Sequence, residues 1–171
     1  MTTSPRTDIP ENTSTLQPTK YLFTIPDLPF AKYFCQKVNI PGISTTPVVF
    51  SNPFTDVKLH GDKPNFETFQ ITVIIDEDLR VFEETFNWIK SYSKPTKFEE
   101  YRNRDGKSRT PIYYDGVLTT LNNANLENIR FHFHHLHPYA ITGLEFDTKL
   151  GSDEIVATVS FTYDYYDIER I

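Results

Sequence analysis

The chain has 171 residues, a formal net charge of −6 at pH 7 and a sequence pI of about 5.3. The length fits one domain or one domain with a tail, and the acidic balance argues against a general nucleic-acid binder or a partner of anionic membranes. No apolar run could span a bilayer and no signal peptide is expected; the single cysteine, Cys35, excludes an internal disulfide and fits a reducing cytoplasm.

Residues 1–19 are predicted to form a flexible amino-terminal arm, because they are rich in Pro and polar side chains and hold few apolar ones. They are either an inert tail or an arm that orders on a neighbouring subunit. Residues 20–171 are expected to form a single β domain. Fourteen Phe, ten Tyr and twelve Pro against six Gly favour strands with proline-marked edges and loops.

The domain is expected to open with extended segments. Residues 20–30 predict a first strand that ends at a Pro-Asp-Leu-Pro turn, and the alternation over 31–40 predicts a second. Residues 44–62 are extended but interrupted by Pro47 and Pro53, which cannot donate a ladder hydrogen bond. This segment is therefore predicted to be an edge strand or a long arm lying over the sheet.

The stretch 61–92 combines an alternating strand with the only strongly helical pattern in the chain. One strand face is predicted to be apolar and buried, and it holds Phe69, Ile71, Val73 and Ile75. The helix is expected over about 77–92, with an apolar stripe of Leu79, Phe82, Phe86 and Ile89 widened by Val81, Trp88 and Tyr92. The acids at 76–78 are interpreted as its amino-terminal cap rather than a metal-binding or acid–base cluster, and Pro95 is expected to stop it.

Residues 94–111 break all periodicity and hold six Lys or Arg against three Asp or Glu, so they are predicted to be an exposed basic loop. The loop is either simply solvated or a contact to an acidic neighbour. Four strands are then predicted, over 112–122, 126–137, 139–147 and 154–168. In the last, one face is apolar, and the other holds Thr158, Ser160, Thr162 and Asp164.

The sequence offers no convincing active site, so no enzymatic activity, cofactor or catalytic residue is expected. His132 and His134 share a strand face at a spacing that can chelate a metal, but no Cys or clear carboxylate partner completes a set, and a surface or subunit contact is favoured. Cys35 is interpreted as a core or interface residue rather than a nucleophile. The tyrosines at 113, 114, 163, 165 and 166 could form a sugar-binding platform, although packing is the favoured interpretation.

The order of these features resembles the tail tube superfamily of bacteriophages, especially the tubes of contractile tails. The resemblance covers roughly residues 20–168 and rests on short motifs: VNIPG at 38–42, Gly61-Asp62, FETFQITVIIDED at 66–78, FNWIKSY at 86–92 and the closing strand at 154–168. Its motif residues in this chain are Gly61, Asp62, Asp76 and Trp88. It implies a mainly β fold, an antiparallel β-sandwich or split barrel with one flanking α-helix.

The resemblance also implies hexameric rings that stack into a tube around a channel for DNA. Candidate channel-lining residues are then the polar faces of two strands, Thr68, Gln70, Thr72, Thr158, Ser160, Thr162 and Asp164. Candidate subunit contacts are Lys97, Arg102, Arg104, Lys107 and Arg109 in the basic loop, and Pro53 and Phe54 in the extended segment. A wall without basic residues would let DNA pass without gripping its phosphates.

The expected function is therefore a structural virion protein of the tail, made in the host cytoplasm. Its expected partners are further copies of itself and other tail, sheath or baseplate proteins, with DNA in non-specific passage and no membrane. Two alternatives stay open. One is a baseplate tube initiator, hub or neck ring of the same fold, and the other is a carbohydrate-binding β-sandwich module.

Overall fold

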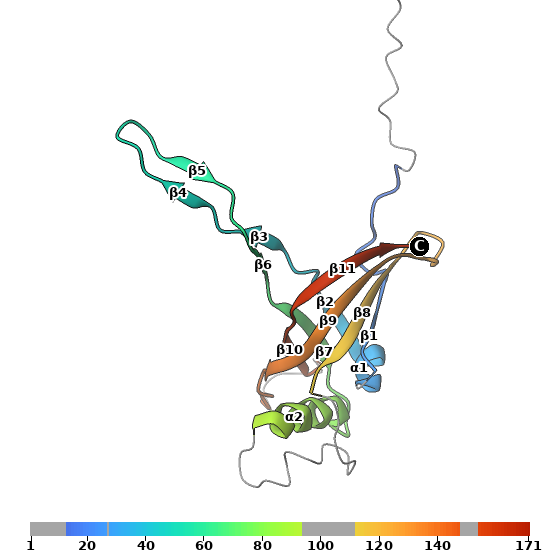
Figure 1. Cartoon of the computed structure of the whole chain (residues 1–171). Coiled ribbons are helices and arrows are strands. Elements are labelled where there is room, and N and C mark those ends of the chain that lie inside the picture. Colours follow the sequence, from blue (N-terminus) through green and yellow to red (C-terminus); the bar gives the residue numbers. More distant parts are fainter. Residues whose placement is uncertain (1–12, 27, 94–111, 148–153) are drawn as a thin grey trace, which may run out of the picture.

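The computed structural model describes residues 13–26, 28–93, 112–147 and 154–171 (Figure 1). The fold is mainly β and all strand pairs are antiparallel, as expected. The basic loop and most of the amino-terminal arm lie outside the described residues.

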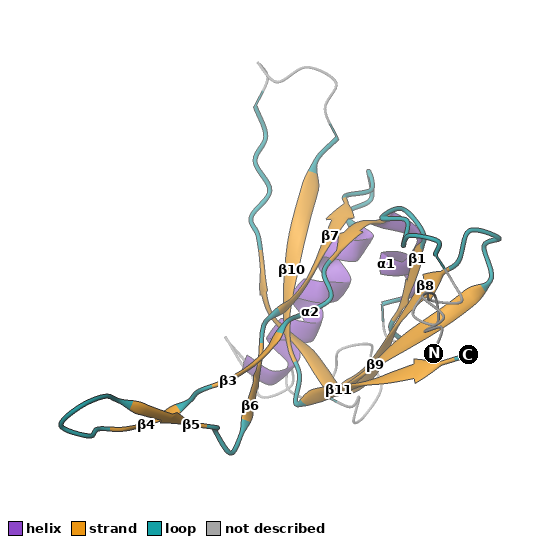
Figure 2. Ribbon diagram, turned by 90° about the horizontal axis from the view of Figure 1, so that it is seen from above, coloured by secondary structure: helices purple, strands orange, loops and turns teal. Residues whose placement is uncertain are grey.

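The strands form two layers that share the long strand β9, Glu127–Ile141. The β8 layer contains β1 (Tyr21–Thr24), β8 (Tyr114–Leu121), the first part of β9 and β11 (Tyr165–Arg170). The β7 layer contains β2 (Cys35–Val38), β7 (Phe69–Ile74), β10 (Val156–Thr162) and the last part of β9. The strand order runs from β1 to β2 without closing, which is an open β-sandwich rather than a closed barrel (Figure 2).

The core lies between the two layers and follows the predicted alternation. The alternate side chains Phe69, Ile71 and Val73 of β7 are buried, and their neighbours on β10 are buried in the same way. From the β8 layer, Phe23 and Phe133 complete this interior, with ring centroids 5.1 and 4.4 Å from Phe69. The predicted buried faces are confirmed over β7 and β10, whereas Ile75 is only partly buried and Tyr165, at the end of the predicted closing strand, is exposed.

Helix α2, Arg80–Ser93, packs across β9, but its start and its buried face differ from the prediction. The helix begins at Arg80, because Leu79 adopts a positive φ of 56° that no helical residue can have. Its buried residues are Val81, Thr85 and Trp88, whereas Phe86 at the centre of the predicted stripe is half exposed. The apolar residues of this helix form a wide arc with Phe82 and Phe86 on one side and Trp88 on the other, so their spacing alone did not show which side faces the core.

Trp88 fixes the helix to the sandwich. It is fully buried, its ring lies edge-on to Tyr114 at 5.3 Å, and its indole N–H donates a 2.9 Å hydrogen bond to the Ile112 carbonyl. Over the described residues, no helix is long and apolar enough to cross a membrane.

Residues 31–40 are not a single strand as predicted. Pro29–Phe34 form a short helix, α1, and only Cys35–Val38 are extended. Proline at the start of α1 has its φ already fixed near the helical value and needs no N–H partner there. Ala31 is buried on the inner side of α1. Packing therefore decides that this segment is helical, because its alternation is too short to distinguish a strand from a helix.

The strand boundaries near the carboxyl terminus also differ from the prediction. The two strands expected over 126–137 and 139–147 are one strand, β9, which runs through Pro138. The continuous run expected over 154–168 is instead two strands, β10 and β11, because the chain bends after Thr162. The bend moves the chain from the β7 layer to the β8 layer, and β9 pairs with both strands in turn.

The segment predicted as an edge strand or long arm is an arm that projects from the sandwich (Figure 1). Its root is the ribbon of β3 (Ile43–Thr45) with β6 (Pro64–Phe66), and its outer part is the ribbon of β4 (Val48–Phe50) with β5 (Val57–Leu59). Neither ribbon pairs with the strands of the two layers.

Candidate functional site

The outer face of the β7 layer carries a polar strip, which gives way at one end to the apolar pair Val156 and Ile74. Thr158 pairs with Thr72 and Ser160 with Gln70, and each pair turns its side chains away from the core. The Gln70 amide donates to the Ser160 hydroxyl at 3.4 Å, and the two threonine hydroxyls lie 3.5 Å apart. These cross-strand contacts make four of the predicted channel-lining residues one continuous strip.

Strand β2 adds a residue to this face that the sequence reasoning missed. The register pairs Lys37 with Thr72, so the Lys37 side chain lies on the outer face, while Val38 pairs with Ile71 on the core side. The face that carries the predicted channel-lining strip therefore also carries a basic side chain. Strict alternation would put Lys37 on the same face as Cys35, but the register shifts between them, and neither this shift nor the pairing partner of β2 was visible in the sequence.

The remaining predicted channel-lining residues lie at the margins of the strip. Thr162 ends β10 opposite His137, and Thr68 lies just before β7, where its carbonyl accepts a 3.0 Å hydrogen bond from the Asn39 amide. Asp164 lies in the bend between β10 and β11, with a carboxylate oxygen 2.5 Å from Nδ1 of His135. That position is not on the β10 face that carries the strip.

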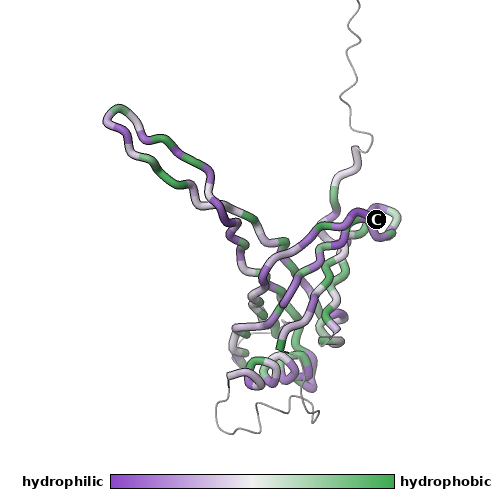
Figure 3. Tube along the Cα trace, in the orientation of Figure 1, coloured by the Kyte–Doolittle hydropathy of each residue, from purple (hydrophilic) through white to green (hydrophobic). Residues whose placement is uncertain are grey.

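The arm exposes apolar side chains along its length, and both of its outer strands carry hydrophobic stretches (Figure 3). The pairs Val48–Leu59 and Phe50–Val57 share one face of the ribbon, and Val49 and Lys58 lie on the other. All of these apolar side chains are exposed, and Phe54 at the tip is 95% exposed beside Pro53. A solvent-exposed two-stranded ribbon is at best marginally stable alone, and an exposed apolar face of this kind is typical of interaction surfaces.

The structure explains why position 61, in the Gly61-Asp62 motif, is a glycine. A Cβ at this position would lie 2.3 Å from the carbonyl oxygen of Thr46 on the other arm strand. Only glycine lets the two arm strands approach this closely. Asp62 next to it is exposed.

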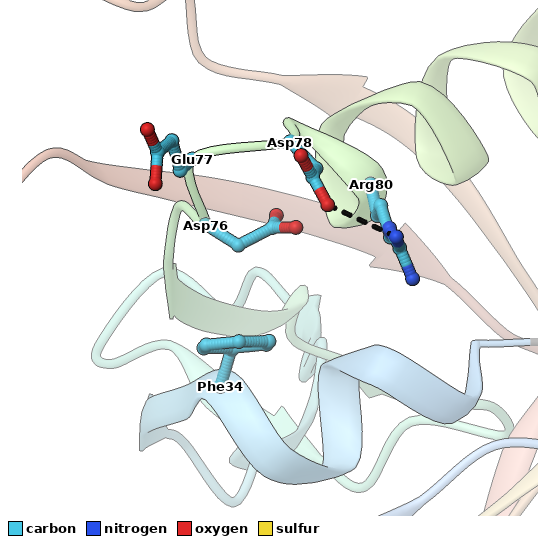
Figure 4. Close-up of a pocket in the computed structure, with 5 residues that line it drawn as sticks. All are labelled: Phe34, Asp76, Glu77, Asp78 and Arg80. Atoms are coloured by element: carbon cyan, nitrogen blue, oxygen red, sulfur yellow. Dashed lines mark ion pairs between the residues drawn. The ribbon is translucent and has the colours of Figure 1, made fainter.

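The acidic turn before α2 borders a shallow pocket of about 350 Å³ (Figure 4). Asp78 forms a 2.9 Å ion pair with Arg80, and Leu79 donates a backbone hydrogen bond of 3.0 Å to the Asp76 carbonyl. One carboxylate oxygen of Asp76 is buried without a hydrogen-bond partner among the described residues. The acids lie one turn ahead of the helix, where their charge still opposes the positive end of its dipole.

The histidines of β9 face carboxylates on the outer side of the β8 layer. His132 Nε2 lies 3.1 Å from Glu169, and His134 Nε2 lies 3.2 Å from Asp167. Carboxylate partners that were not apparent in the sequence thus come from β11 by strand pairing. Within the described ranges, no group of three or more metal-ligating side chains is arranged to hold an ion.

The tyrosines do not make a sugar-binding platform. Tyr163 is buried and Tyr114 packs against Trp88, whereas Tyr113, just before β8, and Tyr165, in β11, are half exposed. A platform needs several rings on one open face, and these rings are divided between the core and two surfaces.

Cys35 lies at the edge of the core, where burial raises the pKa of its thiol to about 11. The reactive form of cysteine is the thiolate, so a high pKa opposes nucleophilic chemistry. We expect iodoacetamide to modify Cys35 at pH 8 on the order of a hundredfold more slowly in the folded protein than in urea. Mass spectrometry of timed samples measures both rates, and equal rates would refute this assignment.

Solved structures similar to this chain come from contractile injection machines. A chain of the anti-feeding prophage baseplate matches with a TM-score of 0.66 at 10% identity, over 93% of this chain and 98% of that one. A chain of the anti-feeding prophage tube-terminating cap gives 0.65 at 12% identity, over 99% and 100%. A chain of the PVC sheath-tube complex, from an extracellular contractile injection system, gives 0.59 at 12% identity, over 93% and 94%. At these identities the likeness shows a shared fold.

A search of curated proteins gives no match. The profile of the family described as "Phage tail tube protein", however, matches residues 18–169, which include both layers, the arm and helix α2. The match spans nearly the whole chain. The chain belongs to the phage tail tube protein family.

Proposed function

We propose that this protein is a non-enzymatic virion protein that forms a hexameric ring of a tail tube, with the outer face of the β7 layer lining the channel. The observation that carries the proposal is the continuous polar strip of Gln70, Thr72, Thr158 and Ser160 on a sheet whose other face is fully buried. A sheet with one solvated polar face and one core face is suited to a shared wall.

The edges of the β7 layer support assembly into a ring. β2 ends the strand order, and the last part of β9 pairs only with β10 among the described strands. Open edges pair readily with other strands, and closing a sheet on itself removes them. Pairing β2 of one copy with β9 of the next would use two different edges, which is the heterologous contact that generates a ring.

The apolar arm supports stacking or lateral docking on another copy. One face of the arm exposes the apolar side chains of Val48, Phe50, Val57 and Leu59, which would be buried on docking. Phe86 on α2 of a neighbouring copy is an exposed apolar side chain on which this face could dock. Pro53 and Phe54 at the tip then remain subunit contacts in this proposal. The basic residues of the 94–111 loop stay candidate contacts to an acidic neighbour.

The proposed channel suits passage of DNA without tight binding. Each subunit presents Lys37 beside hydroxyl and amide groups, so the wall is weakly basic rather than neutral. DNA affinity grows with the number of phosphates that cations neutralise, and one lysine per subunit supplies few such contacts.

Assembly of the purified protein tests the proposal. Light scattering after size exclusion and negative-stain microscopy should give six-subunit rings with a central hole. Stacked rings would identify the repeating tube subunit, whereas single rings would favour the alternative of a baseplate, hub or neck ring. A protein that stays monomeric at high concentration, or is retarded on a polysaccharide column, would overturn the ring proposal.

Adding cations to the proposed wall should slow DNA passage. The double variant Thr158→Lys and Ser160→Lys is expected to assemble normally but to slow DNA ejection severalfold, because each lysine adds a salt-dependent phosphate contact. The control is Tyr165→Lys with Asp167→Lys, which places two lysines at the same spacing on the outer side of the β8 layer and raises the charge there by three, one more than in the test variant. Fluorescence-monitored ejection at two salt concentrations measures the effect, and equal slowing by both variants would count against a β7-layer channel.

A further inference from the structure

Two tyrosines at the bend between β10 and β11 hold the root of the arm. The Tyr163 hydroxyl donates a 2.8 Å hydrogen bond to the Glu67 carbonyl, where the chain leaves the arm. The Tyr166 hydroxyl donates a 3.1 Å hydrogen bond to the Pro41 carbonyl, where the chain enters it. Both sides of the arm root are thus hydrogen-bonded to one short segment of the sandwich, which lies more than 90 residues further along the chain.

Aromatic packing also connects the root of the arm to the core. Phe66, the last residue of the arm root, has its ring 5.9 Å from that of Tyr163 and 5.5 Å from that of Tyr166. Both tyrosine rings in turn pack against Phe133, which is fully buried, at 5.3 and 5.5 Å. Packed aromatic pairs contribute beyond their buried area, so the root is held by rings as well as by hydroxyls.

The two arm strands are also tied to each other at the root. The Glu67 N–H donates to the Gly42 carbonyl at 3.0 Å, and the Glu67 carboxylate accepts the Gly42 N–H at 3.1 Å. A Cβ at Gly42 would lie 2.9 Å from that carboxylate, so a side chain there would displace it. These contacts join the two sides of the root into one unit. The direction of the arm therefore depends on the contacts that Tyr163 and Tyr166 make with this unit.

We propose that Tyr163 and Tyr166 are positioning residues that fix the direction of the arm in the free subunit, before it docks on a second copy. The docking step rests on the proposed function, but the fixed direction does not. Contacts that fix a binding element in its bound conformation raise affinity by reducing the ordering cost of association. The pKa of Tyr163, raised by burial to about 12, keeps its hydroxyl protonated as a donor at any physiological pH.

Removing the hydroxyls while keeping the rings tests this inference. We expect Tyr163→Phe with Tyr166→Phe to fold normally, because the ring packing stays, with unchanged fluorescence of Trp88, the only tryptophan. Tyr165→Phe is the matched control, since Tyr165 lies between the two on the opposite face of the strand and stacks on His134.

The direction of the arm is measured on dilute, unassembled protein by double electron–electron resonance between two spin labels. Spin labels at Phe54→Cys and Asn123→Cys, in a Cys35→Ala background, report the distance from the arm tip to the β8–β9 turn. We expect the tyrosine pair variant to give a distance distribution about twofold wider, because a ribbon held by fewer contacts samples more directions. A distribution equal to that of the Tyr165→Phe control would overturn the inference.

Assembly of the unlabelled variants separates the inference from the proposed function. We expect the double tyrosine variant to need about fivefold more subunit for half-assembly, the factor that corresponds to about 1 kcal/mol per docking event. A narrow wild-type arm distribution in a protein that never assembles would contradict the ring function and leave the positioning role standing. A widened distribution with unchanged assembly would contradict the link between arm direction and docking.

Discussion

Replacing Trp88 by alanine is expected to lower the free energy of unfolding of the subunit by about 3–5 kcal/mol, the range for large aromatic side chains removed from a core. Trp88 is fully buried, contacts Tyr114 and Phe161, and hydrogen-bonds to the Ile112 carbonyl. Its loss leaves a cavity between α2 and the sandwich and removes the partner of a buried carbonyl. Urea unfolding followed by circular dichroism measures the change.

The matched control for this prediction is Phe86→Ala, two residues earlier on the same helix. Phe86 is half exposed, so its truncation should cost less than about 1 kcal/mol in the free subunit. Equal losses of unfolding free energy from the two variants would contradict the assignment of Trp88, rather than Phe86, to the core-facing side of α2. A larger effect of Phe86→Ala on assembly than on unfolding would mark Phe86 as a docking residue.

Replacing Val48 by aspartate is expected to prevent assembly while leaving the subunit folded. Val48 lies on the apolar arm face with Leu59, and a charge on that face would be buried without a partner when the arm docks. An uncompensated buried charge costs several kcal/mol, so the subunit concentration for half-assembly should rise by about a hundredfold or more. Sedimentation velocity over a concentration series measures it.

Val49→Asp provides an unusually close control for the arm prediction. Val49 is the same residue type, adjacent in the chain and 53% exposed against 55% for Val48, but it lies beside Lys58 on the other arm face. Its replacement should leave assembly nearly unchanged. If both variants assemble alike, or if Val49→Asp is the more damaging, the apolar face of the arm is not the docking face.

The parts of the fold that repeat with a clear period were predictable from the sequence. The buried sides of β7 and β10 follow directly from alternation. The proline-broken segment was expected to be an edge strand or an arm lying over the sheet, and it is an arm, but one that projects away from the sandwich. Local pattern is informative there because each strand has one core face and one solvated face.

Features decided by distant contacts were not predictable. Phe86 fits a helical stripe as well as Trp88 does, and only the position of β9 decides which one is buried. Pro138 looks like a strand end, yet β9 continues through it at a shift in register with β10. The bend after Thr162 shifts the alternation by one residue as it moves the chain between layers. Phe161 faces the core in β10, whereas in β11 Tyr166 faces the core and Tyr165 lies on the outer side.

The candidate site shows the same division. Thr72, Thr158, Gln70 and Ser160 were correctly grouped as polar faces of two strands, and the structure adds that the strands are direct neighbours. Lys37 joined them only through the register of β2, which no local pattern encodes. The carboxylates opposite the histidines were missed for the same reason, since they lie more than 30 residues further along the chain.

A cryo-electron microscopy reconstruction of the assembled protein tests the central claim most directly. We predict a six-subunit ring whose channel is lined by Gln70, Thr72, Thr158 and Ser160, with Lys37 beside them and β2 of each subunit paired to β9 of the next. A ring that turns the histidine-bearing side of the β8 layer to the channel, or an assembly without a channel, would contradict the account.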